Sequence, residues 1–390
     1  MRVDRAYSIA DLRRQARRRL PHAIFEFIDG GAGAEQTLAD NQNDFARWRF
    51  LPRVAVNVAS TDTEVRLVGV NAALPLVLAP TGLAGLYWPH GEACAARAAA
   101  AAGIPFCLST NSVASLEEVA AQAPGGDKWF QLYMLRDKNL MWSLLERAAS
   151  AGYRVLCLTL DLAVQGRRER DVRNNFSVPL RPRLRTLLEV AARPAWLAGF
   201  LRAPVRFGNF EQSTSSKGFT SIAQHVASMF DPAADWTGVD EVVRRWPGPV
   251  IVKGVLHPED SRRAADMGVQ AIIVSNHGGR QLDQSRSAIS ALPAVVNAVG
   301  DRVQIILDGG VRRGADIMKA KALGAHACMI GRPFLWGLAA GGEKGVDRTI
   351  QIFRDEIENA MMLLGEPAIA AVQSDILTLA ESNSCSNSQI

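Results

Sequence analysis

The chain of 390 residues has few of the features that mark disulfide-bonded or metal-binding proteins. It contains only five cysteines, and none of them forms a CxxC pair or another metal-ligand spacing. Neither a disulfide framework nor a metal site is therefore expected. Four of the five stand in apolar stretches, which is typical of reduced core cysteines in a cytoplasmic protein. These four are Cys94, Cys107, Cys157 and Cys328, and the fifth is Cys385.

Long apolar runs and a strong charge imbalance are also missing. No run reaches the ~20 residues of a membrane-spanning helix. The basic N-terminal stretch is followed by a short apolar piece, residues 23–28, that contains an acid, so no signal peptide is expected. The net charge is only +5, from 44 Lys+Arg against 39 Asp+Glu, which does not indicate nucleic-acid binding. The length suits one large α/β barrel or two ordinary domains.

Short apolar runs recur from residue 74 onward, and most precede a stretch with helical character. There are eight, at residues 74–79, 105–109, 128–133, 154–161, 249–254, 271–277, 303–309 and 327–331. Runs that are apolar throughout, without alternation, are typical of parallel strands covered on both faces. Eight such strands predict an α/β fold of the (β/α)8, or TIM-barrel, type.

Polar residues and glycines mark the C-terminal ends of these runs, where barrels of this type build their active sites. One such residue alone can be a simple strand cap, but polar groups at all eight ends favour a shared site. The residues are Pro80, Thr81, Gly82, Ser109, Gln131, Tyr133, Thr159, Asp161, Lys253, Ser275, His277, Asp308, Gly331 and Arg332.

The stretch at residues 275–283, Ser-Asn-His-Gly-Gly-Arg-Gln-Leu-Asp, places a histidine and an arginine after one strand. His277 can accept a proton near neutral pH, and Arg280 offers a planar fork that suits a carboxylate or phosphate. A glycine-rich tight turn without function is the alternative. Read as a site, the pair predicts proton abstraction from an anionic substrate.

Glycine- and arginine-rich turns follow the last two strands, at residues 307–314 and 330–333, and each leads into a helical stretch. Backbone N–H groups at such turns can hold a phosphate. The GxGxxG fingerprint is missing from the context in which it binds NAD(P). A different phosphorylated cofactor is therefore expected.

The chain divides into four parts by composition. Residues 1–73 form an N-terminal helical section, with one helix over residues 11–19 and a second that Pro21 opens and the glycines at 30–33 close. Residues 74–379 form the barrel, which carries an insertion at 178–235. Residues 380–390 are a small polar tail, which predicts disorder.

The insertion has a basic and apolar segment at residues 180–210. Leucines and aromatic residues, among them Trp196, Phe207 and Phe210, alternate with its arginines. This composition is typical of a segment that lies in a membrane interface. A lid over the active site or an oligomer contact are the alternatives, and nucleic acid is not expected because no reading module accompanies the cluster. The arginines are Arg181, Arg183, Arg185, Arg193, Arg202 and Arg206.

In this order, the motifs resemble those of the FMN-dependent L-2-hydroxy acid dehydrogenases and oxidases, over residues 8–370. The resemblance implies that FMN is the cofactor and that a mandelate-like or lactate-like L-2-hydroxy acid is oxidised to the 2-keto acid. The matching pieces are residues 79–81, 108–109, 130–133, 158–161, 166–169, 252–254, 275–283, 307–314 and 331–333.

The resemblance also implies a role for individual side chains. His277 would be the base that removes a proton while two electrons pass to the flavin, and Asp161 would orient its imidazole. Arg280 and Arg168 would grip the substrate carboxylate. Lys253 would stand near flavin N1 and O2 and stabilise the reduced flavin.

The remaining implied contacts concern the substrate hydroxyl and the cofactor. Tyr133 would hydrogen-bond the reacting hydroxyl side of the substrate. The isoalloxazine and ribityl groups would contact Pro80, Thr81, Gly82, Ser109, Gln131, Thr159 and Ser275. The ribityl chain and phosphate would be held by Asp308, Gly309, Gly310, Arg312, Gly331 and Arg332.

Two residues depart from the family pattern. Phe27 stands where a tyrosine usually helps to bind the substrate carboxylate, and such a hydrogen bond to a charged group contributes roughly 1.5 to 3 kcal/mol. Phe27 therefore favours a bulkier or aromatic substrate whose side-chain contacts offset the loss. Gly82 stands where family oxidases tend to carry alanine, which resembles the dehydrogenases.

The family's membrane-associated mandelate and lactate dehydrogenases carry a comparable insertion. This implies peripheral attachment through residues 180–210 to the cytoplasmic face of the inner membrane. Electrons would then pass to a quinone or the electron-transfer chain, and relatives are commonly homotetramers. The alternatives are a soluble oxidase that uses O2 and releases H2O2, and a barrel that binds FMN or an acid without turnover, which would not need a base.

Overall fold

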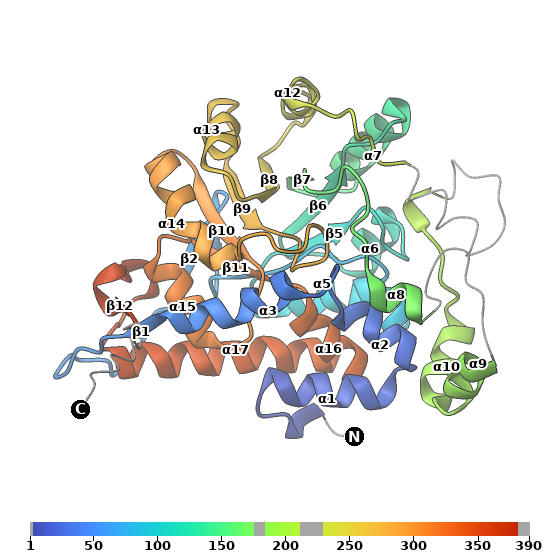
Figure 1. Cartoon of the computed structure of the whole chain (residues 1–390), viewed down its shortest axis with the longest axis horizontal. Coiled ribbons are helices and arrows are strands. Elements are labelled where there is room, and N and C mark those ends of the chain that lie inside the picture. The colour runs from blue at the N-terminus through green and yellow to red at the C-terminus, as the bar shows by residue number, and fades with distance from the viewer. Residues whose placement is uncertain (1–2, 175–183, 211–228, 381–390) are drawn as a thin grey trace, which may run out of the picture.

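Eight parallel strands close into a barrel in the computed structural model, which describes residues 3–174, 184–210 and 229–380 (Figure 1). The strands pair in chain order, and the last returns to the first, with Cys328 opposite Leu76. This confirms the predicted TIM barrel. Each strand matches its predicted run to within two residues at either end. They are β4 (Leu76–Leu78), β5 (Phe106–Ser109), β6 (Lys128–Tyr133), β7 (Val155–Thr159), β8 (Val250–Val255), β9 (Ala271–Ser275), β10 (Gln304–Asp308) and β11 (Ala327–Ile330).

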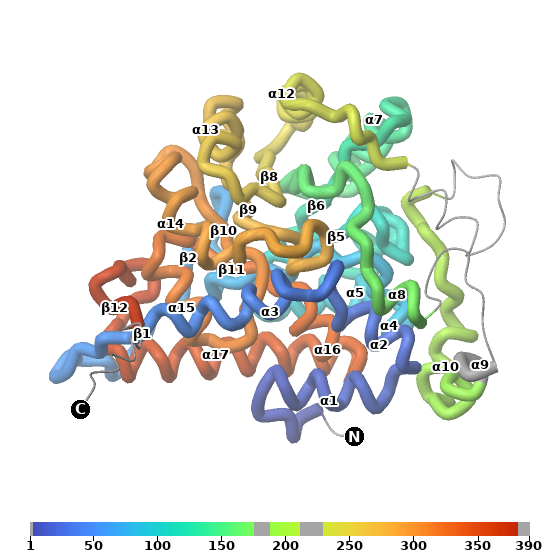
Figure 2. The backbone as a smooth tube through the Cα atoms, viewed as in Figure 1, coloured from blue at the N-terminus to red at the C-terminus, as the bar shows by residue number. Residues whose placement is uncertain are grey.

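Helices follow the strands and surround the barrel (Figures 1 and 2). Several begin at a side chain that caps the free backbone amides: Ser115 accepts from Glu118 N and Asp137 from Leu140 N. The outer helices are α5 (Gly91–Ala102), α6 (Leu116–Gln122), α7 (Lys138–Ser150), α12 (Trp236–Arg245), α13 (Pro258–Asp266), α14 (Ala288–Val299), α15 (Gly314–Ala322), α16 (Arg332–Gly341) and α17 (Glu343–Leu364), with α4 (Ala84–Tyr87) and the 3-10 turn η4 (Gly300–Arg302) between them.

The N-terminal section contains the two expected helices, and Pro21 is the N-cap of the second. Its elements are η1 (Val3–Arg5), α1 (Ile9–Arg19), α2 (His22–Asp29), α3 (Gln36–Asn43) and η2 (Asp44–Arg47). Helix α1 packs on α16, and Ile9, Leu12 and Ala16 form its buried face. The section therefore adds a layer to one side of the barrel.

Three short strands also occur within residues 1–73, in addition to the helices of this section. Strand β1 (Trp48–Phe50) pairs antiparallel with β12 (Leu377–Leu379), and β2 (Val65–Leu67) pairs with β3 (Val70–Ala72). Three-residue strands leave too short a pattern to detect, and β1 depends on a partner more than 300 residues away in the chain. Two 3-10 turns, η5 (Ile369–Ala371) and η6 (Ser374–Ile376), precede β12.

Helix α8 (Glu169–Arg173) follows β7, and the insertion contributes α9 (Leu184–Ala191), α10 (Pro194–Arg202) and η3 (Gly208–Phe210). Helices α9 and α10 stand at one edge of the molecule (Figure 1). Trp196 of α10 is buried and donates its indole N–H to Leu86 O at 2.9 Å, which attaches α10 to the barrel. Arg181 and Arg183, together with the polar tail beyond residue 380, lie outside the described residues.

Four cysteines are free and buried, which confirms that they are core residues: Cys94, Cys107, Cys157 and Cys328. Cys385 lies outside the described part of the chain. Among the described helices, none is both long and apolar enough to cross a bilayer.

Gly310, just after β10, packs directly against α3. Its φ is +82°, and an added Cβ would lie 1.7 Å from Asn41 O. We expect Gly310→Ala to lower the Tm, because the new methyl group forces α3 outward and overpacking of this kind typically costs about 1 to 3 kcal/mol. Gly152→Ala is the matched control, since its φ is +80° but nothing lies within 4 Å of the added Cβ. Equal losses of Tm in the two variants would contradict this packing account.

Candidate active site

One cavity of about 600 Å³ opens at the C-terminal ends of the barrel strands. Three predicted residues, Gln131, Thr159 and Ser275, are buried behind its wall, and Asp161 reaches it through His277. The barrel therefore brings the predicted residues together. Those that line the cavity directly are Phe27, Pro80, Thr81, Gly82, Ser109, Tyr133, Arg168, Lys253, His277, Arg280, Asp308, Gly309, Gly310, Arg312, Gly331 and Arg332.

His277 and Asp161 form a pair at the cavity, with Nδ1 of the ring 2.9 Å from Oδ1 of the carboxylate. Burial raises the pKa of Asp161, but the charges of His277 and Lys253 and the hydrogen bond to His277 outweigh burial and keep that pKa below its ordinary value. The carboxylate is therefore ionised at neutral pH. His277 adopts a left-handed backbone with φ +58°, and its N–H donates to Ser275 Oγ at 3.0 Å.

Lys253, Asp308 and Ser275 form a buried polar triangle beneath the cavity. Lys253 Nζ lies 2.8 Å from Asp308 Oδ2 and donates to Ser275 Oγ at 3.0 Å, while Ser275 donates to Asp308 at 2.7 Å. Burial alone would lower the pKa of Lys253, but the charges of Asp308 and Asp161 raise it above its ordinary value. The lysine is thus a fixed positive charge.

Arg168 and Arg280 lie against the ring of Phe27, with guanidinium carbons 5.3 Å and 5.1 Å from its centroid. Burial, and then the charge of Arg280, lowers the pKa of Arg168 to about 10. Asp171 only partly offsets the two cations, at 3.4 Å from Arg168 Nε. Two adjacent cations that share one counter-ion make a site for an anion.

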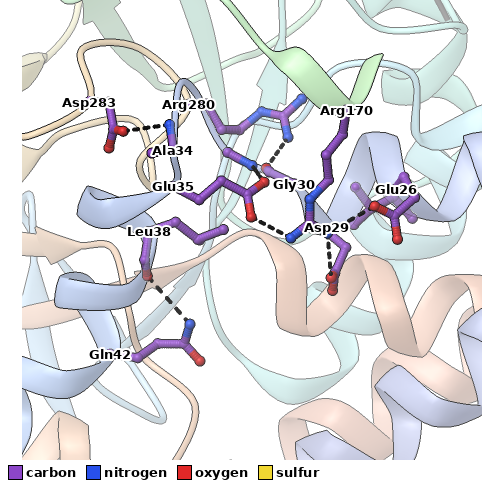
Figure 3. A network of polar contacts seen from close by, with 12 residues as sticks. Glu26, Asp29, Gly30, Ala34, Glu35, Leu38, Gln42, Arg170, Arg280 and Asp283 are labelled. Atoms are coloured by element: carbon purple, nitrogen blue, oxygen red, sulfur yellow. Dashed lines mark hydrogen bonds and ion pairs between the residues drawn. The ribbon is translucent and has the colours of Figure 1, made fainter. Parts of the chain in front are cut away.

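The segment that carries Phe27 is held by a charged network centred on Arg170 of α8 (Figure 3). Arg170 Nη1 lies 2.9 Å from Glu26 and 3.6 Å from Asp29, and Nη2 pairs with Glu35. Glu35 in turn accepts from Gly31 N at 2.8 Å. Arg170 was not predicted from the sequence. Because Arg170 stands two residues after Arg168, the same network also holds the backbone that carries Arg168.

Several buried polar atoms behind the cavity have no partner among the described residues. Gln131 Nε2, Thr159 Oγ1 and Arg312 Nε are such atoms. Gln131 Oε1 already accepts from Ser109 Oγ and Thr110 N, which fixes the amide so that Nε2 is left to donate. An isoalloxazine ring offers carbonyl oxygens and ring nitrogens for such donors, so these residues fit a flavin.

The turn after β10 differs from the phosphate-binding turn that was expected. The amides of Arg312 and Arg313 donate to Asp316 Oδ2 at 2.8 and 2.9 Å, and that of Gly314 donates to Glu356 at 2.7 Å. The expectation that a phosphate uses these amides is therefore wrong for residues 312–314. Arg312 fits the role through its side chain, since burial lowers its pKa to about 10 and an anion would restore it.

Arg332 also has a role that the sequence did not reveal. It lines the cavity, yet its guanidinium donates to backbone carbonyls at 2.7 to 3.2 Å and so joins the end of α2 to the loop after β9. The acceptors are Ile28, Asp29, Gly30 and Gly278.

Apolar and aromatic side chains also line the cavity, and most were not predicted. Phe230 meets the ring of Tyr133 edge-on, with centroids 5.0 Å apart. Phe207 was assigned to the membrane segment by its sequence neighbours, but it is buried and lines this cavity. No sequence pattern distinguished these residues from core. They are Leu162, Val172, Phe207, Phe230 and Tyr87.

A closed (β/α)8 barrel with unpaired donors for a flavin, a buried lysine and a two-arginine anion site defines a flavin-dependent barrel enzyme. Residues 16–379 match the model of the FMN-dependent dehydrogenases, and the chain belongs to that family. The inferred resemblance, the FMN cofactor and the assignment as an FMN-dependent dehydrogenase are thereby confirmed.

Individual relatives agree with this family. The chain is 44% identical to an L-lactate dehydrogenase of Caulobacter vibrioides over 373 residues, which is 95% of this chain and 97% of that protein. The crystal structure of the monotopic membrane protein (S)-mandelate dehydrogenase has a TM-score of 0.92 and 36% identity, and the match covers 96% of this chain and 100% of that one. A mandelate oxidase structure with benzoyl-formic acid has a TM-score of 0.82 and 38% identity, over 96% and 98% of the two chains.

Asp161→Asn tests the His277–Asp161 pair. We expect FMN content to stay the same while the rate of flavin reduction by substrate falls by about 10² to 10⁴, because an amide neither holds the ring in one tautomer nor stabilises its protonated form. Stopped-flow absorbance under anaerobic conditions measures that rate. A rate within about threefold of the unmodified protein would show that the pair has no catalytic role.

Proposed function

We propose that the protein oxidises an L-2-hydroxy acid with a side chain larger than that of lactate to the 2-keto acid. The observation that carries this proposal is the two-arginine clamp, which shares one cavity with the His277–Asp161 pair. The clamp supports a carboxylate substrate, and the pair supports removal of a proton next to it. The relatives found by sequence are L-lactate dehydrogenases, whereas the similar solved structure is that of an (S)-mandelate dehydrogenase.

The proton transfer is assigned to a specific ring atom. Nδ1 of His277 is bound to Asp161, so Nε2 is the nitrogen that accepts the proton of the substrate. Asp161 stabilises the imidazolium that results. Arg168 and Arg280 hold the carboxylate, and Tyr133 is placed to hydrogen-bond the hydroxyl side.

FMN supplies the two-electron acceptor when it is bound. Lys253 carries a permanent positive charge next to the cavity, where it stabilises the negative charge that builds up as the substrate is oxidised. The proposed flavin contacts are Pro80, Thr81, Gly82, Ser109, Gln131, Thr159 and Ser275. Those proposed for the ribityl chain and phosphate are Asp308, Gly309, Gly310, Arg312, Gly331 and Arg332.

The apolar wall supports a bulky substrate side chain. Leu162, Val172, Phe207 and Phe230 line the same cavity as the clamp, and they offer more apolar surface than a methyl group can use. Phe27 lacks a hydroxyl for the carboxylate, so contacts with the substrate side chain would have to contribute more of the binding free energy.

Attachment to a membrane is proposed through α9 and α10. Leu188 and Leu201 are 64% and 68% exposed there, and one related structure is a monotopic membrane protein. The apolar surface is narrower than the composition of residues 180–210 implied, since Trp196, Phe207 and Phe210 are buried in the protein. A peripheral position on the cytoplasmic face, transfer of electrons to a quinone or the electron-transfer chain, and a homotetramer complete the proposal.

A soluble oxidase is the second candidate, because mandelate oxidase structures are similar over nearly the whole chain. Gly82 leaves little space beside the cavity: an added Cβ would lie 3.3 Å from Asn111 Cβ. Stopped-flow reoxidation of the reduced protein by a quinone and by air distinguishes the two functions.

A substrate panel under anaerobic conditions tests the proposed chemistry, with bleaching of the visible flavin band as the readout. We expect (S)-mandelate to give a higher kcat/KM than L-lactate, because the apolar wall adds contacts that a methyl group lacks. Their D-enantiomers serve as controls. A higher kcat/KM for L-lactate would contradict the bulky-substrate proposal, and no bleaching by any 2-hydroxy acid would contradict the function itself.

Membrane attachment is tested with the double variant Leu188→Asp/Leu201→Asp. We expect the intact protein to pellet with vesicles that contain anionic lipid and the variant to stay in the supernatant, because two charges on this surface oppose burial in the interface. Leu363→Asp is the matched control, since Leu363 is 70% exposed and belongs to α17, which is not part of the insertion. Equal pelleting of both variants, or an intact protein that stays soluble at physiological salt, would contradict attachment through this surface.

A further inference from the structure

Tyr87 is a buried tyrosine at the cavity that none of the proposed steps uses. It ends the short helix α4, is only 2% exposed and lines the cavity together with Phe27, Arg168 and Arg280. Its hydroxyl has no hydrogen-bond partner among the residues that the structure describes. Because Tyr87 lines the cavity, its hydroxyl is available to donate to a ligand bound there.

The charged groups that act on Tyr87 are those of the clamp. Burial raises the pKa of Tyr87 above its ordinary value, and the charge of Arg280 opposes that shift only in part; Asp171 and Arg168 also act on the hydroxyl. Tyr87 is therefore neutral and protonated at physiological pH. It can donate a hydrogen bond to an anion that these two arginines hold.

Each arginine of the clamp uses part of its donor capacity within the protein. Nη1 of Arg280 already donates to Phe27 O at 2.8 Å and Gly30 O at 2.9 Å. Arg168 Nε forms an ion pair with Asp171 at 3.4 Å. Phe27 presents only its ring to the two guanidinium groups and has no polar atom to add.

We propose that the Tyr87 hydroxyl donates a hydrogen bond to the substrate carboxylate and so supplies the neutral donor that Phe27 cannot. Tyr87 is then a binding residue of the clamp, contributed by α4 after the first barrel strand. The phenol provides one O–H donor, in addition to the several N–H donors of the two guanidinium groups. Its position determines which carboxylate oxygen faces α4. This inference rests on the proposed binding of a carboxylate substrate between Arg168 and Arg280.

The test compares the dissociation constants of two dead-end probes, benzoate and benzamide, measured by perturbation of the flavin absorbance in the FMN-loaded protein. In Tyr87→Phe we expect benzoate to bind roughly 10- to 100-fold more weakly, as fits the loss of a hydrogen bond to a charged group. Benzamide should bind as before. Equal weakening of both probes, or a benzoate dissociation constant within twofold of the unmodified protein, would overturn the inference.

Tyr153→Phe is the matched control. Tyr153 is also buried, but its hydroxyl donates to Leu116 O at 2.9 Å, away from the cavity. Its loss should lower the Tm without changing the affinity for benzoate. A benzoate effect in Tyr153→Phe as large as that in Tyr87→Phe would mean that the probe reports general destabilisation, and this would also overturn the inference.

Phe27→Tyr provides a second, independent measurement. If Tyr87 serves the carboxylate, a hydroxyl added at position 27 should restore benzoate affinity in the Tyr87→Phe background and add little when Tyr87 is present. Equal gains in the two backgrounds would contradict the proposal. Flavin bleaching by 2-hydroxy acids in the unmodified protein tests the proposed function separately, since failure of that reaction leaves the benzoate comparison valid.

Discussion

The site depends on the hydrogen bonds that two arginines donate to the backbone carbonyls of residues 27–30. Arg280, after β9, donates to the carbonyls of Phe27 and Gly30, and Arg332, after β11, donates to those of residues 28–30. Hydrogen bonds from charged donors are worth about 1.5 to 3 kcal/mol each. These hydrogen bonds hold the end of α2 at the C-terminal end of the barrel, where the Phe27 ring contacts Arg168 and Arg280. The Arg170 network holds the same segment from the side of α8.

The consequence is a concentration of positive charge that the protein itself only partly neutralises. Arg168 and Arg312 both have pKa values lowered to about 10, in each case first by burial. Lys253 differs, because its positive charge is paired with the carboxylate of Asp308 at 2.8 Å. The partly compensated arginines fit two anions, a substrate carboxylate and a cofactor phosphate, whereas the compensated lysine remains a constant charge.

The strands and most of the strand-end residues could be predicted from the sequence, because continuous apolar runs and the polar groups that follow them are local patterns. The side chains that complete the cavity could not. Phe207 and Trp196 stand among exposed-looking arginines, yet both are buried through contacts with distant segments. The sequence predicted that the amides of residues 312–314 are free to bind a phosphate, but Asp316 and Glu356 accept hydrogen bonds from them. Such contacts form only in the tertiary structure, and the spacing of residues in the sequence does not predict them.

The central claim is that His277 is a base whose proton acceptor faces an anion held by Arg168 and Arg280. His277→Ala tests it most directly, with FMN content, benzoate affinity and flavin reduction measured on one preparation. The account predicts that the variant keeps its FMN and binds benzoate within about threefold of the unmodified protein, while reduction by substrate slows by at least about 10²-fold. Unchanged reduction would contradict the assignment of His277 as the base.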